Sequence, residues 1–389
     1  MSKKNKNHTT TDTPDYHTEV ASVSSNIVAF FNKTFSEVHF DGPELDLQKL
    51  QSSSPVMIVS THRSHVDYFA LGATLCVRGL KNLRFAAGDN LTNLPWIGPR
   101  FLSFGAFPVS RSAALERNYI RKLCAQVVEM LEAGDSILVF PEGGRSYSGA
   151  MLDIKGGVLN AALMAQAANP ERDVCLLPAA ISYERPPDAP WFPMLLKGKS
   201  LRGKKPGGFI TRTLGSAYYF GADIAAFAPF MVAKFFRRNY GAVYMDYSAP
   251  VPIRSLVDLE ANRIKEARDE FGAHRASLHK VGAQIHKLFM SLYRLLPVHI
   301  VSAAVKEAGG SVNIPELEAR AAELQAAADN DGRNCKTISG LTPEEIVSRG
   351  LKTLRKMRAV KVKNKNIAIL KPQLINYFAA TLAKDGKDA

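Results

Sequence analysis

Hydrophobic and polar positions follow two different patterns along the chain. As far as about residue 254, short and almost uninterrupted apolar runs alternate with stretches of helical spacing. Such runs are typical of strands buried on both faces, and their alternation with helices favours parallel pairing. The pattern predicts an α/β fold: a mixed, largely parallel sheet flanked by helices. The predicted strands cover 55–61, 83–89, 105–110, 136–140, 174–183 and 242–251.

Helical spacing predicts four helices in the same part of the chain. The clearest is the amphipathic stretch 113–132, because Gly134 stands where a glycine commonly ends a helix. The first predicted helix, 19–38, precedes the first strand. The other two cover 67–80 and 158–168.

Beyond residue 254 the apolar runs nearly disappear, and long helical patterns cover 255–306 and 315–328. Thr342 and Glu345 form a capping box with proline at the first helical position, which predicts a helix start. The segment 359–370 alternates like a hairpin that turns at Lys363–Lys365. A helix followed by a basic hairpin fits a winged-helix nucleic-acid-binding domain, but a helical appendage with a small hairpin is the simpler expectation.

Length and composition agree with a globular protein of more than one part. Of the 389 residues, 46% are hydrophobic and 22% are charged, which is close to ordinary globular usage. The first 16 residues are polar and contain no apolar core of a signal peptide. We predict a disordered N-terminus (1–17), an α/β domain (18–254) and a mainly helical C-terminal region with a small hairpin (255–389).

Charge and cysteine usage narrow the classes of function. The net charge of +14 favours anionic partners, namely nucleic acid, anionic lipid or phosphorylated substrates. The four cysteines form no CxxC pair and have no metal-ligand spacing. We therefore expect reduced thiols in a cytoplasmic protein, and no metal site.

Residues 61–67 read THRSHVD and follow the first predicted strand. Such polarity after a buried run indicates either a decorated helix start or an active site. His62 and Asp67 lie in a loop where the chain can bring their side chains together. A carboxylate bonded to one imidazole nitrogen fixes the tautomer, so that the other nitrogen can take a proton from an alcohol. For an isolated His-x4-Asp pattern, a helix-capping aspartate and a surface histidine would be the commoner explanation.

Three further motifs stand at or near the ends of predicted strands, where α/β sheets bind their ligands. The two glycines after Glu142 would let the backbone approach a ligand closely. Arg111 and Arg145 could each grip a phosphate through two hydrogen bonds, although either alone could also be a surface charge. The three motifs are GAFPVSR (105–111), FPEGGRS (140–146) and LLPAAISYE (176–184).

Taken in order, the four motifs resemble those of the glycerolipid acyltransferase superfamily, and specifically its glycerol-3-phosphate / dihydroxyacetone-phosphate acyltransferase branch. The resemblance covers roughly 55–184, about a third of the chain. HRSHVDY, with its second histidine His65, and FPEGGRS, with two glycines, are similar to the glycerol-3-phosphate branch. More weakly, 295–305 and 369–382 resemble the C-terminal part of that branch.

The resemblance implies an enzyme that moves a fatty acyl group from acyl-CoA or acyl-carrier protein to the sn-1 hydroxyl of glycerol 3-phosphate. The product would be lysophosphatidate, an intermediate of phospholipid biosynthesis. His62 would act as the general base, oriented by Asp67. The chain has no GxSxG elbow and no cysteine within a motif, which agrees with direct attack and no covalent enzyme intermediate. Apart from the acyl donor, no cofactor is expected.

The same resemblance implies a set of substrate-binding residues around the base. Arg111, Glu142, Gly143 and Arg145 would hold the glycerol phosphate, and Pro178 would shape the acyl-donor side. Lys155 follows the third motif closely and would be a second phosphate or donor contact. The full set is Arg63, Ser64, His65, Arg111, Glu142, Gly143, Gly144, Arg145, Lys155 and Pro178.

Two positions depart from the pattern of the branch. Ser110 stands where the second motif often has another arginine, and Tyr147 stands where the third often continues with one. Both changes remove a cation near the expected phosphate site, so dihydroxyacetone phosphate or a lysophospholipid stays an alternative acceptor. An alternative of a different class is a non-catalytic membrane- or nucleic-acid-binding protein, against which the complete set of motif residues argues.

A basic and then apolar segment over 197–238 predicts contact with an anionic membrane. Six Lys or Arg residues within 196–212 precede the apolar run 218–236, which polar residues and a proline interrupt. An interfacial helix fits this pattern better than a spanning one, while a buried helix between surface loops is the alternative. We expect a peripheral or monotopic protein at the cytoplasmic face of a membrane, with no nucleic-acid partner.

Overall fold

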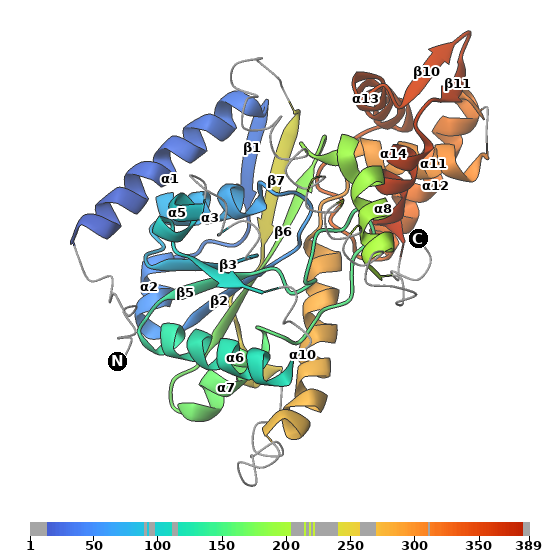
Figure 1. Ribbon diagram of the computed structural model, residues 1–389. Helices are drawn as coiled ribbons and strands as arrows, with labels where there is room; N and C mark the ends of the chain where they lie inside the picture. The colour runs from blue at the N-terminus through green and yellow to red at the C-terminus, as the bar shows by residue number, and fades with distance from the viewer. Residues whose placement is uncertain are drawn as a thin grey trace.

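The computed structural model describes most of the chain, and Figure 1 shows the arrangement of its elements. Within the described part, no helix combines the length and the apolar character that crossing a bilayer requires. Most of 197–238 lies outside the described residues, so the interfacial helix stays a prediction. The described residues are 14–88, 92, 98–110, 116–203, 214, 218, 221, 240–256, 270–309 and 312–383.

An eight-stranded sheet forms the centre of the larger part of the molecule (Figure 1). Its strands lie in the order β1-β7-β6-β2-β5-β3-β4, and β8 pairs with β6. The two pairings of β6 with β7 and β8 are antiparallel, and the other five are parallel. The predicted fold class and all six predicted strands are confirmed. The bounds are β1 Glu37–Asp41, β2 Val56–Ser60, β3 Leu83–Gly88, β4 Ala106–Val109, β5 Ser136–Val139, β6 Cys175–Tyr183, β7 Ala242–Tyr247 and β8 Val251–Pro252.

The N-terminal helix and the first strand differ from the prediction. Helix α1 covers Pro14–Thr34, so residues 14–17 belong to a helix and not to a disordered tail. Its start agrees with a proline at the first helical position, where no intrahelical N–H bond is lost. The last residues of the predicted helix 19–38 instead begin β1, which pairs in parallel with β7. Backbone pairing at the sheet edge overrides the local helical spacing there.

Helices cover both faces of the sheet, and β2 shows how the core is divided. Val56 and Ile58 pack with α1, α2, α3 and α5, whereas Met57 and Val59 pack with α6, α7 and α10. This alternation follows from the two-residue period of a strand that is buried on both faces. The bounds are α2 Leu47–Ser53, α3 Asp67–Val77, α5 Gly98–Ser103, α6 Arg117–Glu132, α7 Asn160–Ala168 and α10 Glu270–Leu292.

Helix α10 shifts the boundary that we predicted at residues 254 and 255. Its buried residues Val281, Ile285 and Phe289 pack against the sheet, so it belongs to the α/β part. The helical patterns predicted over 255–306 include α10 and α11, which are separate helices: α11 begins at Pro297, and before it the amide of Arg294 bonds to the Ser182 hydroxyl of β6. The C-terminal unit therefore begins near Leu295.

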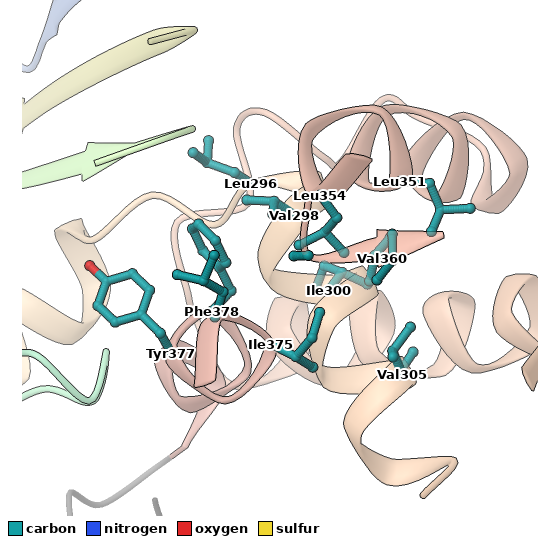
Figure 2. Close-up of a cluster of buried hydrophobic side chains, with 14 of the residues drawn as sticks. Leu296, Val298, Ile300, Val305, Leu351, Leu354, Val360, Ile375, Tyr377 and Phe378 are labelled. Atoms are coloured by element: carbon teal, nitrogen blue, oxygen red, sulfur yellow. The ribbon is translucent and has the colours of Figure 1, made fainter. Parts of the chain in front are cut away.

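The C-terminal unit has its own core, part of which Figure 2 shows. Its capping box at Thr342 and its hairpin turn at Asn364–Lys365 confirm those two predictions. The hairpin strands join β9 to make a three-stranded sheet. Tyr147 and Phe192 of the α/β part also pack into this core, so the two parts share an apolar contact. The bounds are α11 Pro297–Glu307, β9 Val312–Asn313, α12 Ile314–Asn330, α13 Pro343–Lys356, β10 Val360–Lys363, β11 Asn366–Ile369 and α14 Pro372–Ala379.

The remaining elements are short helices and the helix that follows β6. The latter, α8, covers Phe192–Gly203 and packs through Phe192 into the C-terminal core. The 3-10 helices are η1 Ala189–Trp191, η2 Ile253–Ser255 and η3 Ala380–Leu382.

Candidate active site

Three of the four motifs meet at one edge of the sheet because β6, β2 and β5 are parallel neighbours. The loop 61–66 follows β2, the loop that starts at Phe140 follows β5, and residues 184–188 follow β6. Carboxyl ends of adjacent parallel strands lie side by side, which brings together residues that are distant in the chain.

Asp67, at the first position of α3, is completely buried and accepts four hydrogen bonds. His62 Nδ1 lies 2.9 Å from Asp67 Oδ2. The same oxygen accepts from the amides of Arg63 at 2.6 Å and Ser64 at 2.9 Å. The hydroxyl of Tyr183, at the end of β6, donates to Asp67 Oδ1 over 2.7 Å. These four donors hold the side chain of Asp67 in one orientation.

The ring of His62 is fixed by aromatic neighbours as well as by Asp67. It stacks on Phe140 with ring centroids 4.2 Å apart, and the edge of Tyr68 lies 5.2 Å away. A hydrogen on Nδ1 that points to Asp67 leaves Nε2 as the proton-accepting nitrogen. Burial, together with the charge of Asp67, raises the pKa of Tyr183 well above its usual value, so its hydroxyl stays a donor.

Glu142 fastens the first motif to the third. Its carboxylate is completely buried and accepts from the amide of His62 at 3.0 Å, the guanidinium of Arg63 at 3.2 Å and the amide of Leu152 at 3.0 Å. Burial acts to lower the pKa of Arg63, but the charge of Glu142 together with Tyr293, Tyr377 and Asp67 outweighs it, and the net direction is upward. Arg63 also lies over the ring of Tyr293. Neither charge of this pair faces solvent.

Asp188 makes a third fastening, between the first motif, the third motif and the loop after β6. Its Oδ2 accepts from the guanidinium of Arg145 at 2.8 Å and from the amide of His65 at 3.3 Å. Arg145 also donates to the hydroxyl of Tyr147 over 2.7 Å. Tyr147 stands where the branch often has a second arginine, and its hydroxyl thus accepts one of the hydrogen bonds that Arg145 can donate.

The loop 62–65 is therefore an uninterrupted row of amides that carboxylates satisfy. The amide of His62 bonds to Glu142, those of Arg63 and Ser64 bond to Asp67, and that of His65 bonds to Asp188. Each carboxylate also has its own basic side chain: Arg63 for Glu142, His62 for Asp67, and Arg145 for Asp188. Most polar groups of THRSHVD therefore bond to these carboxylates and hold the motif loops together.

The glycines of the third motif lie where a substrate could approach. Gly143 has φ +71°, which favours glycine, and a Cβ there would lie 2.6 Å from Cδ of Lys155. Gly144 has open space at its Cβ position. Lys155 is exposed, and its ammonium group has no hydrogen-bond or ion-pair partner among the described residues.

The structure brings seven predicted site residues together, although not all of them in the expected surroundings. Arg63, Glu142 and Arg145 were predicted to hold the phosphate or bind substrate, but they are buried with protein partners, because the motif loops pack directly on each other. Pro178 lies inside β6, opposite Val59 of β2, where the pairing of β6 changes from β8 to β7. Arg111 lies outside the described residues. The seven residues are His62, Arg63, Ser64, His65, Asp67, Glu142 and Arg145.

Two site residues were missed in the sequence. Tyr183 stands inside the fourth motif, and Asp188 follows it by five residues. A tyrosine at the end of a buried strand was the available signal for the first. Asp188 had none, since its partners His65 and Arg145 are distant in the chain.

Two family models match this chain. The Acyltransferase model matches residues 44–182, and the model of the glycerol-3-phosphate acyltransferase C-terminal region matches 228–376. Together they include the whole site as far as Ser182 and most of the C-terminal unit. The chain is thus similar to acyltransferases over 44–182 and to glycerol-3-phosphate acyltransferases over 228–376. Tyr183 and Asp188 lie just beyond the first matched region.

Curated proteins named glycerol-3-phosphate acyltransferase are similar to about half of the chain. Glycerol-3-phosphate acyltransferases of Xanthomonas axonopodis pv. citri and Xanthomonas campestris pv. campestris are each 31% identical over 214 residues. These alignments cover 54% of this chain but 22% of each relative, so the chain spans about a fifth of their length.

A crystal structure of the 1-acyl-sn-glycerophosphate acyltransferase of Thermotoga maritima is also similar. It has 15% sequence identity and a TM-score of 0.35, and the match covers 70% of this chain and 79% of the other. A likeness of this degree adds nothing to the fold described above.

Proposed function

We propose that the protein transfers a fatty acyl group from a thioester donor to the sn-1 hydroxyl of glycerol 3-phosphate. The observation that carries this proposal is the buried pair of His62 and Asp67, in which Nδ1 is held and Nε2 is the remaining basic nitrogen. Relatives named glycerol-3-phosphate acyltransferase support the choice of acceptor. The donor would be acyl-CoA or acyl-carrier protein, with no further cofactor, and the product lysophosphatidate.

The reaction would proceed by direct attack. Nε2 of His62 takes the hydroxyl proton as the acceptor oxygen bonds to the thioester carbonyl carbon. The carbon–sulfur bond then breaks, and the proton passes from His62 to the departing thiolate. Asp67 stabilises the imidazolium that exists between these steps, and general-base assistance of this kind contributes on the order of 10²- to 10⁴-fold in rate.

Tyr183 would act as a positioning residue in this mechanism. Its hydroxyl holds the Asp67 oxygen that is not bonded to His62. This bond keeps the carboxylate plane aligned with the imidazole and draws negative charge toward Oδ1. Tyr183 would therefore tune how strongly Asp67 raises the basicity of His62.

The phosphate of the acceptor would bind cations that are not already paired with the carboxylates between the motif loops. Arg63 and Arg145 are each paired with a buried carboxylate, whereas Lys155 is exposed beside Gly143. We therefore assign the phosphate contact to Lys155, with Arg111 as a second candidate. The open space at Gly144 would receive the glycerol unit, and Ser64 and His65 would line the same side.

The remaining expectations concern the membrane. A long-chain lysophosphatidate must pass to a bilayer, so we propose attachment to the cytoplasmic face of a membrane through the basic and apolar segment 197–238. The cations of this segment support the choice of an anionic surface.

Acylation of a panel of acceptors tests this function. The purified chain would receive acyl-CoA or acyl-carrier protein with glycerol 3-phosphate, dihydroxyacetone phosphate or a lysophospholipid, and the product would be identified by mass spectrometry. We expect lysophosphatidate from glycerol 3-phosphate. His62→Ala should lower kcat by about 10²- to 10⁴-fold in protein that circular dichroism shows to be folded. Wild-type turnover in His62→Ala would remove His62 from the mechanism, and preference for another acceptor would replace glycerol 3-phosphate.

A further inference from the structure

A strongly basic surface covers the end of α13 and the hairpin that follows it. No acidic residue occurs between Glu345 and Asp385. Eight cations from Lys352 to Lys371 are exposed, and together we call them the α13–hairpin surface. They are Lys352, Arg355, Lys356, Arg358, Lys361, Lys363, Lys365 and Lys371.

The fold holds these cations in one continuous region. In the pairing of β10 with β11, Lys361 lies opposite Ala368 and Lys363 opposite Asn366, and all four side chains are exposed. The alternate positions of the same strands pack into the C-terminal core. Lys371 returns to the end of α13, where its ammonium donates to the carbonyl of Met357 over 3.0 Å. The basic end of the helix is thus joined to the hairpin.

None of the eight cations forms an ion pair with a carboxylate in the part of the chain that the structure describes. Elsewhere in the same unit, exposed cations do have acidic partners. Arg320 on α12 pairs with Glu307 and Glu323, and Arg349, earlier on α13, lies 3.7 Å from Glu345. Like charges that are gathered without partners repel each other, so this surface is suited to an anion from outside the chain.

The side chains beside these cations indicate which polyanion fits. Leu370 is 54% exposed next to Lys371, and its amide is tied to the carbonyl of Ala359. The two aromatic residues between Glu345 and Asp385, Tyr377 and Phe378, are buried and unavailable to stack on bases. Exposed lysines around an apolar side chain match the headgroup and acyl boundary of a bilayer. The hairpin lies at the outer end of the C-terminal unit, away from the eight-stranded sheet (Figure 1).

We propose that the α13–hairpin surface binds the anionic headgroups of a lipid bilayer, with Leu370 entering the interface. This contact is separate from the segment 197–238 and does not depend on acyl transfer. Its attraction is electrostatic, so binding should weaken as ionic strength rises and screening shortens.

The test is co-sedimentation of the full 389-residue chain with phosphatidylcholine vesicles that contain or lack phosphatidylglycerol. The variant Lys361→Glu/Lys363→Glu should bind the anionic vesicles at least about 20-fold more weakly, because each cation near such a surface contributes about fivefold. The control Lys49→Glu/Lys81→Glu makes the same change in net charge at exposed positions of the α/β part, and should bind like the wild type. A milder variant, Lys361→Gln/Lys363→Gln, repeats the test should the reversal disturb folding, which circular dichroism reports.

Three outcomes would overturn the proposal. The first is equal loss of binding in the control pair, which would reduce the effect to net charge. The second is binding that falls only when the lysines of 197–205 are changed. The third is unaltered vesicle binding with lost affinity for a fluorescent duplex oligonucleotide, which would make nucleic acid the partner. Binding that depends on phosphatidylglycerol, on salt and on Lys361 and Lys363 supports it.

Discussion

The cations of the motif loops and those of the α13–hairpin surface have opposite surroundings. Arg63 and Arg145 are 1% and 2% exposed, and each faces a buried carboxylate. The hairpin lysines are exposed and have no acidic partner among the described residues. An unpaired charge is costly in the interior but tolerated in water. Pairing therefore marks the cations that build the site, and its absence marks those that remain for a ligand.

The largest effect is expected from a variant that breaks the buried ion pair of Arg63 and Glu142. Glu142→Gln keeps the shape of the side chain but leaves the guanidinium of Arg63 uncompensated. We expect the free energy of unfolding to fall by about 3–5 kcal/mol, as measured by urea denaturation. The exposed control Arg355→Gln should change it by less than about 0.5 kcal/mol.

A double variant separates pairing from simple damage. Arg63→Met/Glu142→Gln removes both charges, so it should be clearly more stable than the sum of the two single losses predicts. Strictly additive losses would contradict the pair.

The second test compares Arg145 with Lys155. Arg145→Ala leaves Asp188 buried without its cation, so it should lower the melting temperature and kcat and leave the KM for glycerol 3-phosphate nearly unchanged. Lys155→Ala should do the reverse and raise that KM by about tenfold or more, since a bond to a charged group contributes about 1.5–3 kcal/mol. Steady-state kinetics and thermal unfolding of both variants decide the matter. A higher KM in Arg145→Ala with unchanged stability would return Arg145 to the phosphate site.

The smallest effect concerns Tyr183. Tyr183→Phe removes a donor from Asp67, so its carboxylate should act more strongly on His62 and raise the pKa of that imidazole. A base with a higher pKa is neutral only at higher pH. The acidic limb of the plot of kcat/KM against pH should therefore shift to higher pH. The stability loss should be about 1 kcal/mol, typical of one hydrogen bond.

Asp67→Asn serves as the reference background for Tyr183→Phe. Without the carboxylate charge, the added Tyr183→Phe change should shift the profile no further. A shift of equal size in that background would show that Tyr183 acts independently of Asp67.

Much of the fold could be predicted because the residues within each strand or helix indicate its conformation. The strand of β2 is five apolar or small residues in a row, and Gly134 stands after α6 as a stop signal. The mistakes arose where a distant partner decided the conformation. Residues 37 and 38 joined β1 because β7 supplies its hydrogen bonds. Helix α10 joined the α/β part because its apolar side meets the sheet.

The site divides in the same way. His62 and Asp67 could be paired from their spacing and their place after a strand, and the structure sets them 2.9 Å apart. The partners of the other charges were not readable, since Glu142 bonds to a residue 80 positions away and Asp188 to one 123 positions away. These residues come within hydrogen-bonding distance only because β6, β2 and β5 lie side by side in the sheet.

By itself, the sequence determined the α/β pattern, the four motifs and the identity of the His62–Asp67 pair. All of these depend on periodicity or on residues a few positions apart. Only the tertiary structure decided which charges face each other and which face solvent. Burial makes that decision, because a charge that loses its water must find an opposite charge, and the order of the strands determines which one is within reach.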